Sequence, residues 1–386
     1  MEDKLIQYHR ENTSNQVHNT NNLYLLNGHI SNSAVSRYAI QIGEIVNLQS
    51  HLLTLSLTSK MSEQCAGKTI QKLRLPAVIH PLEKPFLALE YLVNKTLSPR
   101  ALQQYFEKNV SNSNTENNII HYTDITLPPI IKKFISTVTV HDLIYLKKYY
   151  IPTTIQEKRF SKVFSKYVEQ YKKFKSIITV SESTKSQMVE EGFEGNISVI
   201  YPPIKKNFVC LSAETRDSVR LKLGLPLDKK LILSVSSNDR RKNLSVVEET
   251  VTHLGNDFKL VRVGSPCKDS INFERVDNNT LNLIYNACDV MLFPSLSEGF
   301  GSPLVESMAT GLPIVASDIE VVREVIGEAG IIVEPTVDAC VKGVKDALEN
   351  NSFLIESGLS RSKKFSLASF ANEMNAYYRN LMKRGE

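Results

Sequence analysis

The chain has 386 residues, and its lysines and arginines outnumber its aspartates and glutamates by only 46 − 41 = 5. This length predicts two domains with separate hydrophobic cores, because a single core rarely grows beyond about 300 residues. The small charge excess argues against a nucleic-acid-binding protein, which usually carries a concentrated basic stripe.

The five cysteines lie far apart and show no CxxC or Cys/His spacing. They predict neither a disulfide framework nor a zinc site, and they favour a reducing cytoplasm. Residues 1–21 are polar and rich in asparagine, so we expect a loose arm there. No apolar run approaches the roughly 20 residues that span a bilayer, which predicts a soluble or peripherally membrane-bound chain.

From residue 22 to about residue 205, apolar runs rich in valine, isoleucine and leucine alternate with longer segments of helical period. The predicted strands lie at 23–26, 136–140 and 176–180, and the predicted helices lie at 33–46, 155–174 and 182–191. This alternation is typical of an α/β domain with a parallel sheet, so we expect a first Rossmann-like domain over 22–205.

A polar, proline-bearing stretch interrupts this pattern, and we place the domain boundary after residue 205. A second series begins with a helix near 212–223 and a strand at 231–235. The βα units that follow predict a second doubly wound domain over 206–365, and a final helix is expected over 366–386. The two domains should face one another across a cleft, because open α/β sheets bind ligands at the carboxyl ends of their strands.

The stretch PSLSEGFGSPLVESMATGLPIV, residues 294–315, carries the strongest functional signal. It follows the predicted strand DVMLF, and Pro303 is expected in the first turn of a helix that Gly311 ends. A helix N-terminus suits a phosphate, because its N–H groups are unpaired and its dipole is positive there. Glu298, and Glu306 in the expected first turn, are acceptors for sugar hydroxyl groups. Together these features suit a nucleotide-sugar, whereas an acid that only stabilises the helix dipole would explain Glu306 alone.

The spacing of Glu298 and Glu306, with seven residues between them and EGFG intact, resembles the signature of retaining GT-B glycosyltransferases of the family-four type, the glycosyl transferases group 1. The flanking segments are also similar to the donor domain of that family. The resemblance implies that Glu298 contacts the transferred sugar and that Glu306 holds the ribose hydroxyls. It also implies that Phe300 and Gly301 present backbone amides to the sugar. The other donor-binding residues expected in this part of the domain are Gly264, Gly299 and Ser302.

A second motif, SSNDRRKN, places Arg240, Arg241 and Lys242 between a predicted strand and the next helix. Fixed cations there would stabilise the charge that develops on a leaving diphosphate. The motif resembles the arginine–lysine pair of the family, with Lys242 as the matching lysine. It departs from the family because Ser236 and Ser237 replace Gly-Arg. Whether Arg240 or Arg241 substitutes stays open; we include Arg241 and Ser237 among the donor-binding residues, and the alternative is a solvated helix start.

In the first domain, the predicted strand at 136–140 is followed by His141 and Asp142, again at the carboxyl edge of a sheet. The segments NIIHYTDITLPPI and TVTVHDLIYLKKYYIP are similar to the mannosyltransferase-like branch of the same family. The resemblance implies that His141 contacts the donor sugar near its reacting carbon and that Asp142 orients the loop or the imidazole. A lone histidine is more often structural, and His121 is the weaker of the two candidates.

Two further features of the first domain bear on the acceptor. Ala34, Val35 and Ser36 stand where the family often has a glycine-rich turn before Arg-Tyr, although Arg37 and Tyr38 keep the match. Without glycine the backbone cannot approach a ligand so closely. The second feature is a basic helical segment that could dock on anionic lipid headgroups, with a solvated helix face as the equally open alternative. Its basic residues are Lys158, Arg159, Lys162, Lys166, Lys172, Lys173 and Lys175.

The chain has no DxD triplet, which predicts a metal-independent reaction. The resemblance implies transfer with retention, in which the leaving phosphate takes the acceptor's proton while the protein orients the reactants and stabilises charge. No cofactor is then expected beyond a UDP- or GDP-sugar substrate, and the expected acceptor is a glycan or a lipid-linked molecule. In this family the final helix commonly crosses back to the first domain and couples both halves during closure.

Two alternatives stay open. A degenerate, non-catalytic nucleotide- or glycan-binding protein would account for the altered glycine-rich turn and the missing Gly-Arg, although Glu298, Lys242 and His141 argue against it. A GT-B sugar epimerase would share both domains but would need further acid/base carboxylates. Turnover of a nucleotide-sugar would separate a transferase from a binding protein.

Overall fold

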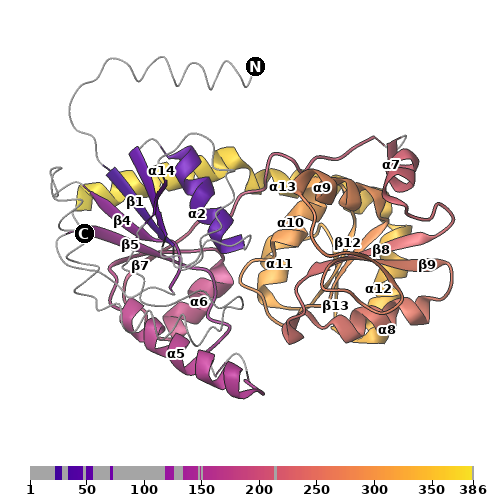
Figure 1. The fold of residues 1–386 in the computed structure, drawn as a ribbon, viewed down its shortest axis with the longest axis horizontal. Coiled ribbons are helices and arrows are strands. Elements are labelled where there is room, and N and C mark those ends of the chain that lie inside the picture. The colour runs from indigo at the N-terminus through magenta and orange to yellow at the C-terminus, as the bar shows by residue number, and fades with distance from the viewer. Residues whose placement is uncertain are drawn as a thin grey trace, which may run out of the picture.

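The computed structural model describes residues 22–27, 34–46, 49–54, 70–72, 118–125, 134–146, 148, 151–212 and 215–384. These residues form two parallel sheets with helices around them, one sheet in each half of the molecule (Figure 1). The loose arm expected at 1–21 lies outside the described residues. Within the described ranges, every helix is too short or too polar to span a bilayer.

In the part of the chain described, the first sheet has the strand order β3-β2-β1-β4-β5-β6-β7, and all neighbouring strands are parallel. Its strands are β1 (Asn22–Asn27), β2 (Gln49–Thr54), β3 (Ile70–Lys72), β4 (Ile119–Tyr122), β5 (Ile135–Val140), β6 (Ser176–Thr179) and β7 (Asn196–Val199). Its helices are α2 (Ala34–Ile45), α5 (Ile155–Tyr171) and α6 (Glu182–Glu190). The strand order reverses between β1 and β4, which is the point where such sheets bind ligands.

The second sheet, again among the described residues, has the order β10-β9-β8-β11-β12-β13 and is also parallel. Its strands are β8 (Lys230–Ser236), β9 (Phe258–Gly264), β10 (Ser270–Phe273), β11 (Val290–Phe293), β12 (Ile314–Ser317) and β13 (Ile331–Val333). The helices around it are α7 (Arg216–Leu223), α8 (Leu244–Leu254), α9 (Asn278–Ala287), α10 (Ser302–Ala309), α11 (Glu320–Ile326), α12 (Val337–Glu349) and α13 (Asn351–Ser362). Two short 3₁₀ helices, η3 (Arg240–Lys242) and η4 (Lys363–Phe365), precede α8 and the final helix α14 (Leu367–Arg384). The strand order of this sheet reverses between β8 and β11.

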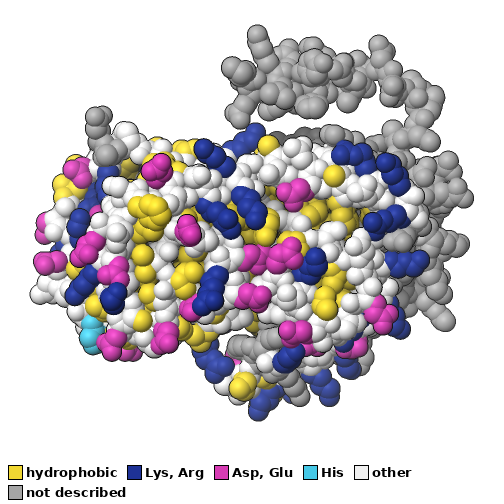
Figure 2. All heavy atoms as spheres, turned by 180° about the vertical axis from the view of Figure 1, so that it is seen from behind, with side chains coloured by type: hydrophobic (Ala, Val, Ile, Leu, Met, Phe, Trp, Pro, Cys, Tyr) yellow, Lys and Arg dark blue, Asp and Glu magenta, His cyan; other side chains and the backbone are white. Residues whose placement is uncertain are grey.

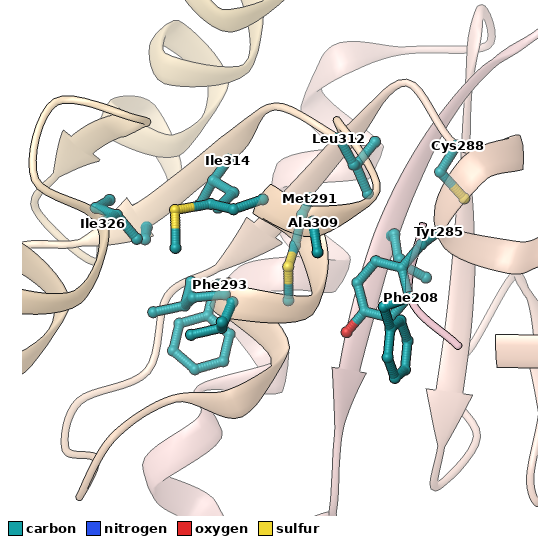
Figure 3. Packing of buried hydrophobic residues seen from close by; sticks show 14 of the residues in the cluster. Phe208, Tyr285, Cys288, Met291, Phe293, Ala309, Leu312, Ile314 and Ile326 are labelled. Atoms are coloured by element: carbon teal, nitrogen blue, oxygen red, sulfur yellow. The ribbon is translucent and has the colours of Figure 1, made fainter. Parts of the chain in front are cut away.

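Both faces of the second sheet are buried, which explains why its strands are continuous apolar runs. Along β8, Leu231 and Leu233 belong to one core cluster and Ile232 belongs to another, as the alternation of side chains in a strand requires. Figure 3 shows part of the first cluster, where the rings of Phe208 and Tyr285 meet edge to face with centroids 5.7 Å apart. This contact joins the segment before α7 to the second domain.

The final helix, α14, lies along β1 and α2 of the first domain, far from the second sheet (Figure 1). Its buried residues Phe370, Met374 and Tyr378 belong to one hydrophobic cluster with Leu23 and Tyr38. Helix α14 therefore contributes to the core of the first domain.

His121 is a core residue of the first domain. Its Nδ1 lies 2.6 Å from the hydroxyl of Tyr378, its Nε2 lies 2.7 Å from Thr139 Oγ1, and none of its surface is exposed. Burial lowers the pKa of this imidazole to about 3. His121 therefore joins α14 to β4 and β5, which favours the structural role over the weaker functional one.

The depressed pKa of His121 predicts a pH-dependent stability. The unfolded imidazole takes up a proton near pH 6.5, whereas the folded one does so only near pH 3. Between these values the unfolded state binds more protons, so this contribution to stability is complete above pH 6.5. It is lost as the pH falls, by up to about 1.4 kcal/mol per pH unit. Urea denaturation between about pH 7 and pH 5 measures the free energy of unfolding at each pH. This free energy should change less with pH in His121→Gln than in wild type. The same change with pH in both proteins would contradict this expectation.

Candidate functional site

The loop after β11 meets the segment after β5 where the two domains touch. Gly299 in this loop has no room for a side chain, because a Cβ there would lie 2.3 Å from the carbonyl oxygen of His141 and 2.9 Å from Asp142 Cβ. His141 and Asp142 directly follow the last residue of β5. The structure thus brings these three predicted site residues together from two domains, and glycine at 299 is required by their close approach.

Glu298 lies between two cations from the loop after β8. Arg241 Nη1 donates a hydrogen bond to Glu298 Oε2 at 3.1 Å, and Lys242 Nζ donates one to Glu298 Oε1. Only 7% of the Glu298 side chain and 11% of the Lys242 side chain are exposed. Charge-assisted hydrogen bonds are strong in such a site. The trio thus places two cations, which suit an anion, beside a carboxylate that suits hydroxyl groups, and Asp239 compensates part of the Arg241 charge.

The short helix η3 presents these cations. Asp239 begins it, because its Oδ1 accepts a hydrogen bond from Arg241 N and its Oδ2 accepts one from Arg241 Nε, both at 3.0 Å. The Arg241 carbonyl accepts a hydrogen bond from Leu296 N at 2.7 Å, which ties the loop after β8 to the loop after β11. Arg240 instead donates to a backbone carbonyl of the first domain at 3.0 Å. Arg241 rather than Arg240 therefore stands beside Lys242 at Glu298.

Burial changes the pKa values of these groups. It lowers the pKa of the Lys242 ammonium, and the Glu298 carboxylate opposes that change. Burial also lowers the pKa of the Arg241 guanidinium, but Glu298 and Asp239 outweigh it and leave this pKa raised. Burial raises the pKa of the Asp142 carboxyl, and Arg241 opposes this shift. Arg241 is thus a permanent cation that interacts with Asp142 of the first domain and with Glu298 of the second.

His141 is held in one tautomer. Its Nε2 donates a hydrogen bond to the Thr123 carbonyl at 2.8 Å, and the Tyr38 ring meets the imidazole edge to face at a centroid distance of 5.0 Å. Burial lowers the pKa of His141, so the imidazole is neutral at neutral pH and Nδ1 is an acceptor. The Asp142 carboxylate accepts a hydrogen bond from Ile144 N at 3.2 Å. Asp142 therefore orders the loop, which is one of its two predicted roles.

Glu306 does not lie in the first turn of α10, and that prediction is wrong. The helix begins at Ser302, one residue before Pro303, and Gly301 precedes it with a φ of 92°. This start places Glu306 in the second turn, so a favourable interaction with the helix dipole does not explain it. Its side chain is buried, and its Oε2 accepts a hydrogen bond from the Tyr285 hydroxyl at 2.9 Å.

The Phe300 ring packs against the two chain connections between the domains. Its centroid lies 6.1 Å from that of Tyr201 and 5.6 Å from that of Phe365. The ring thus anchors the loop. The backbone amides of Phe300 and Gly301 are the groups that remain for the predicted contact with a sugar.

The other predicted donor-binding residues lie at the carboxyl edge of the second sheet. Ser237 directly follows β8 and is exposed. Gly264 ends β9 with a φ of 120°, and a Cβ there would lie 2.1 Å from the Ser236 carbonyl oxygen. Ser302 is the first residue of α10. The side chain of Arg37, expected near the acceptor, lies outside the described part of the chain.

The polar contacts that join the domains around Gly299 have no local signal in the sequence. Ser181 Oγ donates a hydrogen bond to the Gly299 carbonyl at 2.8 Å, across 118 residues of sequence. The Glu324 carboxylate accepts hydrogen bonds from Glu182 N at 2.7 Å and from Ser183 N at 3.0 Å, at the start of α6. A carboxylate is favourable at a helix N-terminus, but no local pattern links partners so distant in sequence.

Residues 215–363 match the profile of a known family, described as Glycosyl transferases group 1. The second domain belongs to this family. The chain is 29% identical over 206 residues to the O-antigen chain mannosyltransferase RfbU of Salmonella typhimurium, which is 52% of this chain and 56% of that one. It is 34% identical over 107 residues to O-antigen chain mannosyltransferase B of Escherichia coli, or 26% and 28% of the two chains. The chain thus spans about half the length, or less, of these curated relatives.

Solved structures share the arrangement of both domains. Sucrose-phosphate synthase from Thermosynechococcus elongatus superposes with a TM-score of 0.77 at 18% identity, covering 94% of this chain and 100% of the other. HepE of Anabaena, in complex with UDP-glucose, gives 0.71 at 13% identity, covering 93% and 99%. At such identities the likeness concerns the fold alone. The chain has a GT-B fold, which confirms the fold class predicted from the sequence, and the mannosyltransferase relatives agree with the predicted branch.

Proposed function

We propose that the chain is a retaining glycosyltransferase that moves a sugar from a nucleotide-diphosphate sugar to a hydroxyl group of an acceptor. The main support is the contact of Glu298 with both Arg241 and Lys242, beside the His141 segment of the other domain. A carboxylate for sugar hydroxyls and two cations for a diphosphate are the groups that such a donor needs. The relatives named as mannosyltransferases favour a mannosyl donor.

In this proposal the donor lies along the carboxyl edge of the second sheet. Its diphosphate faces the N-terminus of α10 and the cations Arg241 and Lys242, where both the helix dipole and the charges favour an anion. Its ribose hydroxyls donate to Glu306, whose carboxylate the Tyr285 hydroxyl holds from behind. The transferred sugar faces Glu298 and the neutral imidazole of His141.

The chemistry assigned to this site is a substitution at the anomeric carbon with retention. The bond between that carbon and the β-phosphate oxygen breaks, and the acceptor oxygen forms its bond on the same face. The acceptor's proton moves to the leaving phosphate oxygen. Arg241 and Lys242 stabilise the charge that develops on the diphosphate, so the proposed reaction is metal-independent. Neither an enzyme nucleophile nor a further cofactor takes part. The acceptor is a glycan, a lipid-linked sugar or another hydroxyl compound.

Thermal unfolding with UDP, GDP, ADP and their sugars tests the donor site without metal. A ligand that binds only the folded state raises the melting temperature, so one nucleotide series should stabilise the wild type. Glu306→Gln keeps the shape of the side chain but loses the charge that holds the ribose. The nucleotide should therefore raise the melting temperature of this variant, measured from its own ligand-free value, by less than it raises that of wild type. No shift with any nucleotide would overturn the proposed donor site.

Replacing Gly299 by alanine should impair transfer more than donor binding. The new Cβ must displace the His141 carbonyl from a position only 2.3 Å away, which separates the two loops. We expect turnover to fall by roughly tenfold or more with little change in nucleotide affinity, because a shift of about 1 Å misaligns reacting groups. Gly358→Ala is the control, since its Cβ would lie an ordinary 3.5 Å from Met308. Equal turnover in both variants would contradict this role of Gly299.

The basic helix α5 is the proposed contact with a membrane that presents a lipid-linked acceptor. Lys158, Arg159 and Lys162 are exposed on it, and dark blue side chains gather over α5 at the bottom of Figure 2. Ile151 and Ile155, where the helix begins, are 77% and 70% exposed. Exposed aliphatic groups beside cations suit an anionic lipid surface, because the aliphatic groups can enter the interface while the cations contact the headgroups.

Reversing two charges on α5 should weaken this contact. We expect the wild type to sediment with vesicles that contain phosphatidylglycerol and not with purely zwitterionic vesicles. Lys158→Glu combined with Lys162→Glu should lower the bound fraction about tenfold or more, because each basic residue contributes about 1 kcal/mol near such a surface. Lys342→Glu with Lys345→Glu, on exposed positions of α12, gives the same change in net charge. Equal losses in both double variants would assign the binding to net charge alone.

A further inference from the structure

Arg262 has the largest side chain among the fully buried residues that the structure describes. It lies near the carboxyl edge of the second sheet. Its strand, β9, pairs with β8 so that Arg262 stands opposite Ser234. Nη1 donates hydrogen bonds to the carbonyls of Ser234 at 3.0 Å and Val263 at 2.7 Å. Nη2 donates to the carbonyl of Ser236 and, at 3.1 Å, to the Ser236 hydroxyl.

All these hydrogen-bond acceptors are uncharged. Among the described residues Arg262 forms no ion pair, and its buried Nε lacks a hydrogen-bond partner. The titratable group that interacts with the guanidinium is the Cys267 thiol, and burial raises the pKa of this thiol, which keeps it uncharged. An arginine stays protonated in proteins, so burial cannot remove the charge. A buried charge without a counter-ion is strongly unfavourable, which argues against a purely structural role for this arrangement. The arrangement becomes favourable when an anion binds nearby.

The guanidinium binds the first residue of the segment that leads to Arg241 and Lys242. The Ser236 carbonyl and hydroxyl that it binds directly precede Ser237, which is exposed. Gly264, which would place a Cβ 2.1 Å from the Ser236 carbonyl, lets β9 approach β8 closely at this edge. The same loop continues from Ser237 to Arg241 at Glu298. Arg262 therefore fixes the start of the segment that carries the proposed diphosphate-binding cations.

We propose that Arg262 is a positioning residue for the donor diphosphate, which it serves by fixing Ser236 and Ser237 and by supplying a buried positive charge beneath them. This inference rests on the proposed function, because it assigns the anion to the diphosphate of the donor. Arg262 touches the diphosphate only through the serine segment.

Titration calorimetry with UDP, GDP, UMP and GMP tests this role on the full chain. Arg262→Gln should weaken binding of the preferred nucleoside diphosphate by roughly tenfold or more, because one close charge is lost from a poorly solvated site. Binding of the monophosphate should weaken less, and Arg262→Lys should recover part of the loss. Arg323→Gln, an exposed arginine paired with Asp318 at 2.6 Å, is the control for net charge and should bind like wild type.

A second measurement does not depend on the fold of the glutamine variant. In wild-type protein labelled with ¹⁵N-arginine, the Nε–H resonance that is absent from Arg262→Lys should move when the preferred nucleoside diphosphate binds and move less with its monophosphate. Two results would overturn the inference and leave Arg262 a structural residue. One is an equal loss of affinity for the diphosphate and the monophosphate in Arg262→Gln, and the other is an Nε–H resonance that does not move when the diphosphate binds. Absence of any nucleotide binding by wild type would instead overturn the proposed function, and the inference with it.

Discussion

Replacing Glu298 by glutamine should reduce sugar transfer by about 10²- to 10³-fold, the loss typical of removing one preorganised charged group from a reacting centre. The carboxylate accepts hydrogen bonds from both Arg241 and Lys242. The glutamine amide has one acceptor oxygen and no charge, so it cannot replace both charge-assisted hydrogen bonds. The substitution also leaves two largely buried cations with reduced compensation, so the free energy of unfolding should fall by roughly 3 kcal/mol. Initial rates and urea denaturation measure the two effects.

The same variant should bind a nucleoside diphosphate more tightly than wild type does. In the wild type Glu298 neutralises part of the charge on Arg241 and Lys242, and its loss makes both cations available to the phosphates. Lower turnover together with higher nucleotide affinity is a combination that a merely misfolded variant does not give. Glu349→Gln, at the exposed end of α12, serves as a control for losing one acid. Reduced affinity for the nucleoside diphosphate in Glu298→Gln would contradict the assigned roles.

Replacing Lys242 by methionine should lower kcat/KM about 10²-fold, because a fixed cation is lost where the leaving diphosphate gains charge. Methionine keeps much of the length and the apolar stem of lysine, which matters because the Lys242 ammonium lies 5.7 Å from the Phe293 ring centroid. Affinity for the nucleoside diphosphate product should fall with the rate, whereas affinity for the nucleoside alone should not. Steady-state kinetics and calorimetry measure these quantities.

Arg240→Met is the matched control for Lys242→Met. Arg240 belongs to the same 3₁₀ helix, but its guanidinium bonds a backbone carbonyl of the first domain and not Glu298. Its loss changes the net charge by the same amount and should leave kcat/KM within about threefold of wild type, as for other exposed substitutions. If Arg240→Met impaired transfer as much as Lys242→Met does, the general charge of the loop would matter rather than the position of Lys242.

Much of the second domain could be predicted from the sequence, because its sheet is buried on both faces. A strand such as β11, with all four residues buried, is a continuous apolar run, and Pro303 and Gly311 mark the helix after it. The turn that contains Glu306 was missed because Gly301, with its positive φ, lets the helix begin one residue before Pro303. Helix ends depend on such local geometry more than on periodicity.

The contacts between residues of the candidate site could not be predicted in the same way. Sequence placed Glu298 and Lys242 at the ends of two strands, but their ion pair depends on β8 and β11 being neighbours at the switch point. The bond from Ser181 to Gly299 depends on how the domains meet. Arg262 did leave a signal, since one arginine interrupts the apolar run of β9. Such an interruption in a buried strand identifies a charge that needs a partner.

Turnover of nucleotide-sugars by the wild-type chain tests the central claim most directly. UDP- and GDP-sugars should be incubated without metal, with and without simple sugar acceptors, and followed by ¹H and ³¹P NMR, with Glu298→Gln as the comparison. We predict that one nucleotide-sugar is consumed, by transfer or by slow hydrolysis, that the released nucleotide appears in equal amount, and that the product keeps the anomeric configuration of the donor. Nucleotide binding without consumption of any donor would contradict the claim and identify a non-catalytic nucleotide-binding protein with a GT-B fold.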